Sequence, residues 1–321
     1  MDIDAIVHAG TLDDTFLLPP DRPFTRTAAL AAGVARRSLD TLIREGVVRR
    51  PIRGAYVGTQ VPDSIALRAA CLRVVVPPDC VVVDRHAGWL HGAQMILAPG
   101  EHLELRPLSL FRPSGRGRLR NHLTRSGERQ LRGDDVMEVD GLRVTTPLRT
   151  AWDLGRVRWT DESITGLDAM FRLGAFTRDE LLAGIERFRG TRWITTLRAI
   201  GPLADGRSES PGESVLRLRC IECGVRVEPQ REVFRDGALI ARLDLADPML
   251  QTGFEYDGAE WHSSQDQLAH DRDRRRAVEA AGWVVRAFVA SDVFGRQRAC
   301  EEVVRQVTRD ARARRGLRPA G

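Results

Sequence analysis

Three carboxylates stand close together in residues 242–262, RLDLADPMLQTGFEYDGAEWH, where two short apolar runs flank a turn. Strand alternation places Asp244 on the same face as Glu255 and Asp257, provided that the hairpin turns symmetrically about residues 249–250. Asp244 then lies opposite Glu255, with about 5 Å between facing Cβ atoms. Two carboxylates at that distance repel each other unless one is protonated or a cation lies between them.

A hard divalent cation removes this repulsion, because magnesium prefers oxygen ligands and needs only a few carboxylates besides water. The pattern therefore predicts a Mg²⁺ or Mn²⁺ site with Asp244 and Glu255 as ligands. A second explanation is also open. The same register places Arg242 opposite Asp257, where it can neutralise that carboxylate and leave the other two acids solvated on an exposed sheet face.

The elements that must position these acids follow the order αβββαβ. Apolar runs and turn residues predict a helix over 211–223, strands over 225–233, 239–247 and 251–257, a helix over about 264–281 and a buried strand over 283–289. At the start of the first helix, Ser210 is the expected N-cap, Pro211 the first helical residue and Glu213 the reciprocal partner of a capping box.

The cluster continues into E-x-D-G-x-x-W-H at 255–262, D-x-x-R at 271–274 and GWVVR at 282–286. In order and spacing, this series resembles a family of uncharacterised bacterial proteins related to very-short-patch-repair endonucleases, over about residues 208–292. That family belongs to the restriction-endonuclease-like PD-(D/E)xK superfamily. The resemblance implies a C-terminal restriction-endonuclease-like domain that hydrolyses phosphodiester bonds in DNA with Mg²⁺ or Mn²⁺.

The resemblance also implies roles for five residues. Asp244 matches the first metal-binding aspartate, and Glu255 matches the second acid of the motif. Asp257 stands where the superfamily usually has lysine, and His262 matches a histidine beside the scissile phosphate, where it would act as acid or base. Glu213 lies in an entry helix whose glutamate points towards the metal in that family, so this role and the capping box both remain open.

The chain departs from the superfamily pattern in having no lysine. All 49 basic residues are arginines, so no lysine from another element can supply the missing charge. This favours a second hypothesis, in which the last domain keeps the nuclease fold only as a binding platform. The protein would then be a non-catalytic DNA-binding regulator. Asp271 and Arg274, one helical turn apart, are expected to form an ion pair that braces their helix.

Residues 25–58 predict two short helices followed by two basic strands around Arg53-Gly54. Thr25 is the expected N-cap of the first helix, and Leu30, Leu39 and Leu42 are expected on the buried faces.

A helix pair with a following wing is typical of a winged helix-turn-helix that binds DNA. Arg36 and Arg37 would then reach bases from the start of the second helix, and phosphates would lie along the arginines of the wing, Arg49, Arg50 and Arg53. A solvated basic helix in a protein-binding domain is the alternative. With its strand Arg53-Gly54-Ala55-Tyr56-Val57, the stretch resembles the winged helix of AbiEi-like antitoxins, which implies a regulator with a cognate toxin.

The remaining sequence predicts an α/β fold of several domains. Residues 61–203 form a middle α/β domain of unclear role, and the polar segment from Ala204 marks its end. The expected domains are therefore 1–60, 61–203 and 204–321. An Arg/Gly loop at 112–120, RPSGRGRLR, either clamps a nucleic-acid backbone or is a mobile surface loop.

Composition agrees with a soluble protein. The chain is 42% hydrophobic and 29% charged, and no run approaches the roughly 18 apolar residues of a membrane span. A net charge of +5 permits nucleic-acid binding. Five scattered cysteines indicate reduced thiols and a cytoplasmic location. The expected partners are DNA and either a cognate toxin or a second copy of the chain.

Overall fold

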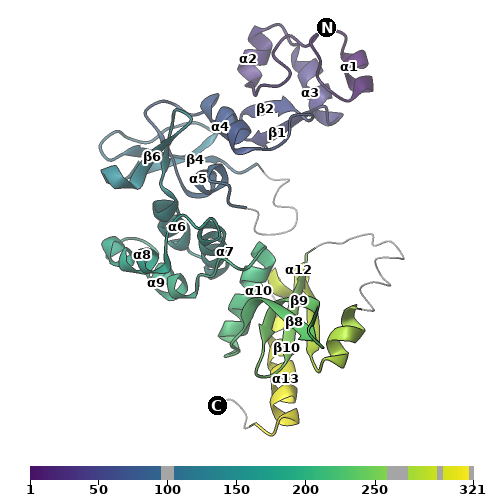
Figure 1. Ribbon diagram of the computed structural model, residues 1–321. Helices are drawn as coiled ribbons and strands as arrows, with labels where there is room; N and C mark the ends of the chain where they lie inside the picture. Colours follow the sequence, from purple (N-terminus) through teal and green to yellow (C-terminus); the bar gives the residue numbers. More distant parts are fainter. Residues whose placement is uncertain (95–104, 259–273, 295–298, 318–321) are drawn as a thin grey trace. The chain divides into compact units, whose positions relative to one another are not determined.

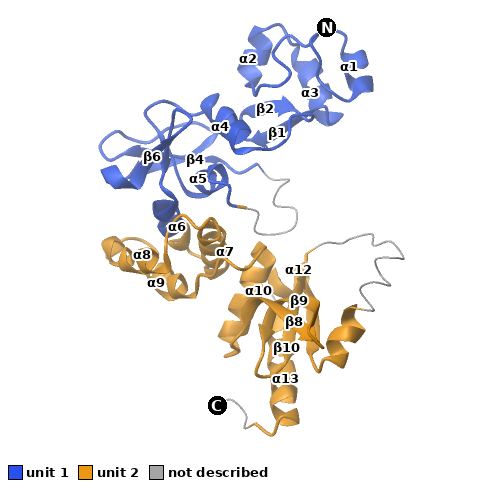
Figure 2. Cartoon of the chain, viewed as in Figure 1, with its two compact units in different colours: residues 1–93, 103–153 blue, residues 94–102, 154–321 orange. Residues whose placement is uncertain are grey.

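The computed structural model describes residues 1–94, 105–258, 274–294 and 299–317 (Figure 1). The chain forms two compact units (Figure 2). Unit 1 comprises the described residues of 1–93 and 103–153, and unit 2 comprises Gln94 and the described residues from Leu154 onward. The α/β, multi-domain class expected from the sequence is confirmed. The boundaries expected after residues 60 and 203 both lie inside these units.

Unit 1 begins with three helices and a two-stranded wing. The elements are α1 (Ile3–Ala9), α2 (Arg26–Ala31), α3 (Arg36–Arg44), β1 (Val48–Ile52) and β2 (Ala55–Gly58). The Thr25 side chain caps α2 by accepting a hydrogen bond from the Ala28 N–H at 3.0 Å. Leu39 and Leu42 are buried as expected, but Leu30 is exposed, because α2 turns Ala29 towards the core instead.

The rest of unit 1 is a five-stranded mixed sheet with helices. Its elements are α4 (Ile65–Arg73), β3 (Val81–Val82), α5 (Asp84–Leu90), β4 (Leu108–Pro113), β5 (Thr124–Arg129), β6 (Val136–Val139), β7 (Leu142–Thr145) and α6 (Pro147–Gly155), whose end crosses into unit 2. The strand order is β5-β4-β3-β7-β6. Strands β4 and β5 pair in parallel from Leu108↔Thr124 to Pro113↔Arg129.

Unit 2 contains a group of helices followed by a four-stranded sheet. The elements are α7 (Thr160–Phe171), α8 (Arg178–Ala183), α9 (Ile194–Ile200), α10 (Pro211–Glu222), β8 (Glu228–Arg235), β9 (Ala238–Asp247), β10 (Thr252–Asp257), a helical segment at 274–280, β11 (Val284–Val289), α12 (Ala290–Phe294) and α13 (Ala299–Arg314). The predicted αβββαβ order from 211 to 289 is confirmed for the described residues. The strand order is β11-β10-β9-β8, with β10 and β11 parallel.

Helix α10 joins the helical group to the sheet through buried arginines. Arg217 donates to Asp168 of α7 at 2.7 Å, and both side chains are almost fully buried. It also donates to the Leu203 carbonyl at 2.7 Å. Arg219, two residues along, bonds Asp161 of α7. These contacts explain why the segment around Ala204 does not separate two compact units.

No helix in the described part of the chain is long and apolar enough to cross a membrane.

Asp168→Ala should lower the free energy of unfolding of unit 2 by about 3–5 kcal/mol, because Arg217 would remain buried without a counter-charge. Urea unfolding followed by tryptophan fluorescence measures this loss. Glu186→Ala is the matched control, since it removes an exposed partner of Arg198 and should cost about 1 kcal/mol or less. Equal losses for the two variants would contradict a stabilising role of the buried pair.

Candidate functional site

The hairpin of β9 and β10 has the register expected from the sequence. Its paired residues are Thr252↔Asp247, Gly253↔Ala246 and Phe254↔Leu245, so Asp244 and Glu255 come next in line. The ladder ends just before them. The backbone N–H of Tyr256 donates to Oδ2 of Asp244 at 2.9 Å, so a side chain takes the place of a partner carbonyl. Beyond this point, β10 continues to pair only with β11 among the described strands.

A cleft of about 640 Å³ opens where the ladder ends. Its charged lining consists of four arginines and four acids, namely Arg242, Arg274, Arg275, Arg286, Asp244, Glu255, Asp257 and Glu279. Arginine guanidinium groups bind phosphate oxygens through paired hydrogen bonds, and carboxylates bind hard cations. The lining therefore suits a phosphate ester together with a metal ion.

The carboxyl group of Asp244 in this cleft has a perturbed pKa. Burial raises the pKa of its carboxyl group from 3.8 to about 6, and the hydrogen bond from the Tyr256 N–H opposes that rise. The negative charges of Glu213 and Glu255 raise the pKa further, and the positive charge of Arg274 lowers it. Acids on α10 and β10 thus act electrostatically on the acid of β9. A carboxylate with a raised pKa beside other acids is a common sign of a functional site.

Glu213 serves the helix start as well as the cleft. Ser210 caps α10 by accepting a hydrogen bond from the Glu213 N–H at 3.2 Å, and Pro211 is the first helical residue, as expected. Oε2 of Glu213 accepts hydrogen bonds from the Glu209 N–H and from Gln230 Nε2, each at 2.8 Å. The reciprocal bond therefore goes one residue earlier than a capping box requires, and the charge of Glu213 still acts on Asp244.

Arg274 provides a positive charge inside the cleft. It lies in the helical segment 274–280, and its guanidinium group donates to Oε1 of Glu255. The expected partner in its own helix, Asp271, lies outside the described residues. Sequence reasoning missed the contact with Glu255. The D-x-x-R motif is the available signal, but its spacing predicts an ion pair within one helix.

The other predicted members of the cluster lie apart from this contact. Asp257 is exposed at the end of β10 and lines the cleft. Arg242, expected opposite Asp257, forms an ion pair with Glu209 at 2.9 Å instead. His262 lies outside the described residues.

The donor set fits a divalent cation held by few protein ligands. Within the described ranges, no group of three or more His, Cys, Asp or Glu side chains could hold a metal ion. Magnesium, however, is usually bound by one or two carboxylates, together with water and substrate phosphates. Asp244 and Glu255 supply such oxygen donors, and the hydrogen bond from Arg274 competes for an oxygen of Glu255.

The arginines of the winged module divide into two groups. Arg36 and Arg37 are exposed in the first turn of α3, and Arg50 is exposed over the Tyr56 ring, 5.3 Å from its centroid. Arg49 donates to the Val61 carbonyl at 2.7 Å. Arg53 donates to the carbonyls of Leu105 and His122, each at 3.0 Å. Arg49 and Arg53 therefore tie the wing to the following domain, a task that the sequence did not indicate.

Comparison with known proteins gives relatives without an assigned activity. No family model matches the chain. The uncharacterized proteins MT2308 and Rv2248 of Mycobacterium tuberculosis are each 28% identical to it over 261 residues. The alignment covers 81% of this chain and 92% of each relative, so the similarity extends well beyond a single module.

Asp244→Asn should stabilise the protein at alkaline pH. The folded state holds the Asp244 proton up to about pH 6, whereas the unfolded chain releases it near 3.8, so stability falls as the pH rises between these values. Asparagine removes that penalty and keeps an acceptor for the Tyr256 N–H. We expect a gain of up to about 3 kcal/mol near pH 8 and almost none near pH 4, measured by urea unfolding. An equal gain at both pH values would contradict this assignment.

Two neighbouring substitutions should shift the pKa of Asp244 in opposite directions. Arg274→Met should raise it above about 6, because a favourable positive charge is lost, and Glu213→Gln should lower it, because a repelling negative charge is lost. Carbon-13 NMR titration of labelled aspartate carboxyl groups measures both shifts. Arg275→Met, which changes a neighbouring arginine of the cleft, is the control and should leave this pKa nearly unchanged. Shifts of the same sign would refute the proposed arrangement of charges.

Proposed function

We propose that this protein is a metal-dependent DNA endonuclease whose catalytic cleft lies between β9, β10 and the helical segment 274–280. The observation that carries the proposal is the half-buried Asp244, whose pKa is raised to about 6 beside Glu213 and Glu255 in a cleft lined with arginines. The resemblance of residues 208–292 to patch-repair endonucleases supports the same reaction. We place the reaction in the cytoplasm.

Asp244 and Glu255 would hold the Mg²⁺ or Mn²⁺ ion. When bound, the ion supplies an activated water molecule and stabilises negative charge on the phosphate. Asp244 is largely ionised above about pH 6, so it binds a cation at neutral pH and loses that ability in acid. The guanidinium groups of Arg242 and Arg286 hold the phosphodiester in the cleft. His262 and Asp257 orient the water or protonate the leaving oxygen in this proposal.

Arg274 supplies positive charge to a cleft that has no lysine. Its positive charge lies beside Glu255, inside the cleft. With a cation bound to Glu255, the guanidinium group of Arg274 would stabilise negative charge on the phosphate. The cleft therefore has its own source of positive charge.

A second candidate function is a non-catalytic DNA-binding regulator of the AbiEi antitoxin type. The observation that favours it is the neutralisation of Glu255 by Arg274, which leaves the cleft charge partly balanced without a metal. In that case the last domain would bind a cognate toxin or a second copy of the chain. The winged module, with Arg36 and Arg37 exposed, would bind DNA in both cases.

A cleavage assay with plasmid DNA tests the first function. The unmodified protein should nick or cut DNA with Mg²⁺ or Mn²⁺, and Asp244→Asn should reduce the rate on the order of a hundredfold or more. Asp236→Asn is the matched control. This exposed turn residue has φ +52°, which asparagine tolerates, so activity should not change.

Calorimetry with Mn²⁺ separates the two functions. The endonuclease should bind the ion through Asp244 and Glu255, so binding should be lost in Asp244→Asn and retained in Asp236→Asn. Cleavage at the same rate in all three proteins would overturn the assignment of the site. Absence of both cleavage and metal binding would favour the regulator.

A further inference from the structure

A second cationic surface lies in unit 1, on the loop of residues 114–123 between β4 and β5. Parallel strands need a connection that returns along their whole length, which is about 20 Å for six residues. The ten residues of the loop, which could span about 33–36 Å if fully extended, cover this path.

Hydrogen bonds to the sheet further restrict the loop. The carboxylate of Glu128 on β5 accepts the backbone N–H groups of Gly115, at 3.0 Å, and Gly117. These bonds lower the pKa of Glu128 and therefore favour its charged form. The φ angles of Gly115 and Gly117 are +88° and +71°, in the region that glycine adopts most easily. The glycines that alternate with arginine in the sequence thus allow the loop to adopt a defined backbone conformation.

The second half of the loop is anchored as well. The Leu119 N–H donates to Ser126 Oγ at 3.0 Å, and the Leu119 side chain packs against the core of the sheet domain. The Asn121 side-chain carbonyl accepts the N–H groups of Leu123 and Thr124, each at 3.0 Å. A loop with these contacts is not merely a mobile surface segment.

Three arginines alternate with these anchored residues and face the solvent. Arg116, Arg118 and Arg120 are exposed, and none has an acidic partner among the residues that the structure describes. Some other exposed arginines are partly neutralised, as Arg189 and Arg198 are by Glu186. The loop therefore presents uncompensated positive charge on an ordered backbone.

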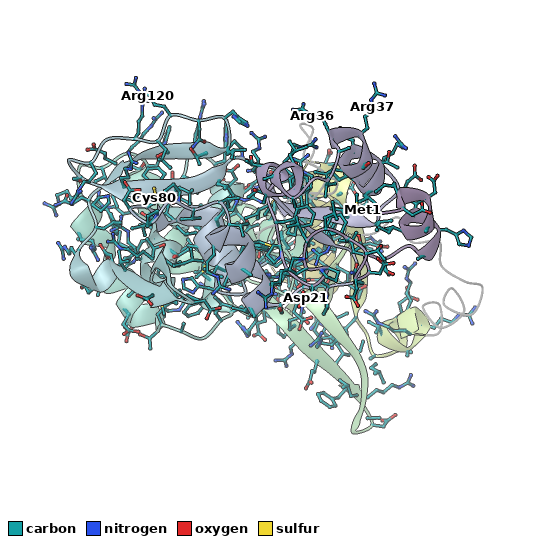
Figure 3. All side chains as sticks on the ribbon, turned by 90° about the horizontal axis from the view of Figure 1, so that it is seen from above. Met1, Asp21, Arg36, Arg37, Cys80 and Arg120 are labelled. Atoms are coloured by element: carbon teal, nitrogen blue, oxygen red, sulfur yellow. The ribbon has the colours of Figure 1, made fainter. Side chains whose placement is uncertain are left out.

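The loop is continuous with the winged module. Arg53 of the wing donates to the His122 carbonyl in the loop at 3.0 Å, and a Cβ atom placed on Gly54 would lie 3.5 Å from the Leu123 side chain. Figure 3 shows Arg120 projecting from the same side of unit 1 as Arg36 and Arg37. A ligand that lies on the exposed start of α3 can therefore extend over the loop.

We propose that the loop of residues 114–120 is a second contact for double-stranded DNA and that it binds the phosphate backbone beside the winged helix. The inference rests on the DNA-binding part of the proposed function and not on the nuclease cleft. Phosphates match the surface because they are negative, regularly spaced and able to accept paired hydrogen bonds from guanidinium groups. The middle domain thereby gains a role in substrate binding.

The test compares two triple variants of the full chain. The first replaces Arg116, Arg118 and Arg120 by glutamine. The control replaces Arg189, Arg192 and Arg198 of unit 2, which are also exposed, so that both proteins lose the same charge. Fluorescence anisotropy measures the affinity for a random duplex of about 30 base pairs at several salt concentrations.

The loop variant should bind at least about tenfold more weakly near 0.1 M salt, and its slope of log affinity against log salt should shrink by about two to three. The control should keep the slope and stay within about twofold in affinity. Equal losses in both variants, an unchanged slope in the loop variant, or binding of RNA duplexes in place of DNA would overturn the inference. The assay measures binding and not cleavage, so failure of cleavage and failure of this inference remain distinguishable.

Discussion

Asp244 lies at a point where the fold brings three acids together and partly excludes water. The carboxylates come from α10, β9 and β10, and each is held by a bond of its own. Tyr256 donates its backbone N–H to Asp244, Gln230 donates its amide to Glu213, and Arg274 donates its guanidinium to Glu255. These bonds oppose the repulsion between the acids without removing it, and the pKa of Asp244 stays raised. Proteins tolerate such local conflict mainly where it serves function.

The position of the acids depends on elements outside the hairpin. Helix α10 places Glu213 at its first turn, while Arg217 and Arg219 anchor its later turns to α7. The helical group of residues 160–203 therefore supports α10, the helix that carries Glu213. Because buried ion pairs are geometrically demanding, they limit how far α10 can shift relative to the sheet. In this way the cleft gains rigidity from residues that never line it.

Arginine carries all the basic chemistry of this chain, and its side chains do two kinds of work. Buried examples such as Arg149 neutralise acids within unit 1, where Arg149 bonds Asp135 at 2.6 Å. Others bind backbone carbonyls, as Arg53 does at two positions. A guanidinium group suits both tasks because its five donors form a flat, rigid fork. Other arginines are exposed, among them those on α3 and on the loop after β4.

The order of elements in the last domain and the register of its hairpin could be predicted from the sequence. Both depend on local signals, namely the alternation of apolar side chains and the turn after Asp247. The cap at Ser210 is equally local. Leu30 shows the limit of such reasoning, because a helix of six residues leaves its buried face to be decided by the surrounding core.

The sequence by itself determined which carboxylates follow one another along β9 and β10, and it excluded any lysine at the site. Only the tertiary structure decided that Arg274 binds Glu255, that Arg242 turns to Glu209, and that Arg53 holds the wing to the loop. It also decided the raised pKa of Asp244. These properties depend on which distant atoms come within hydrogen-bonding distance and on how much water the packing excludes, and neither is encoded in local spacing.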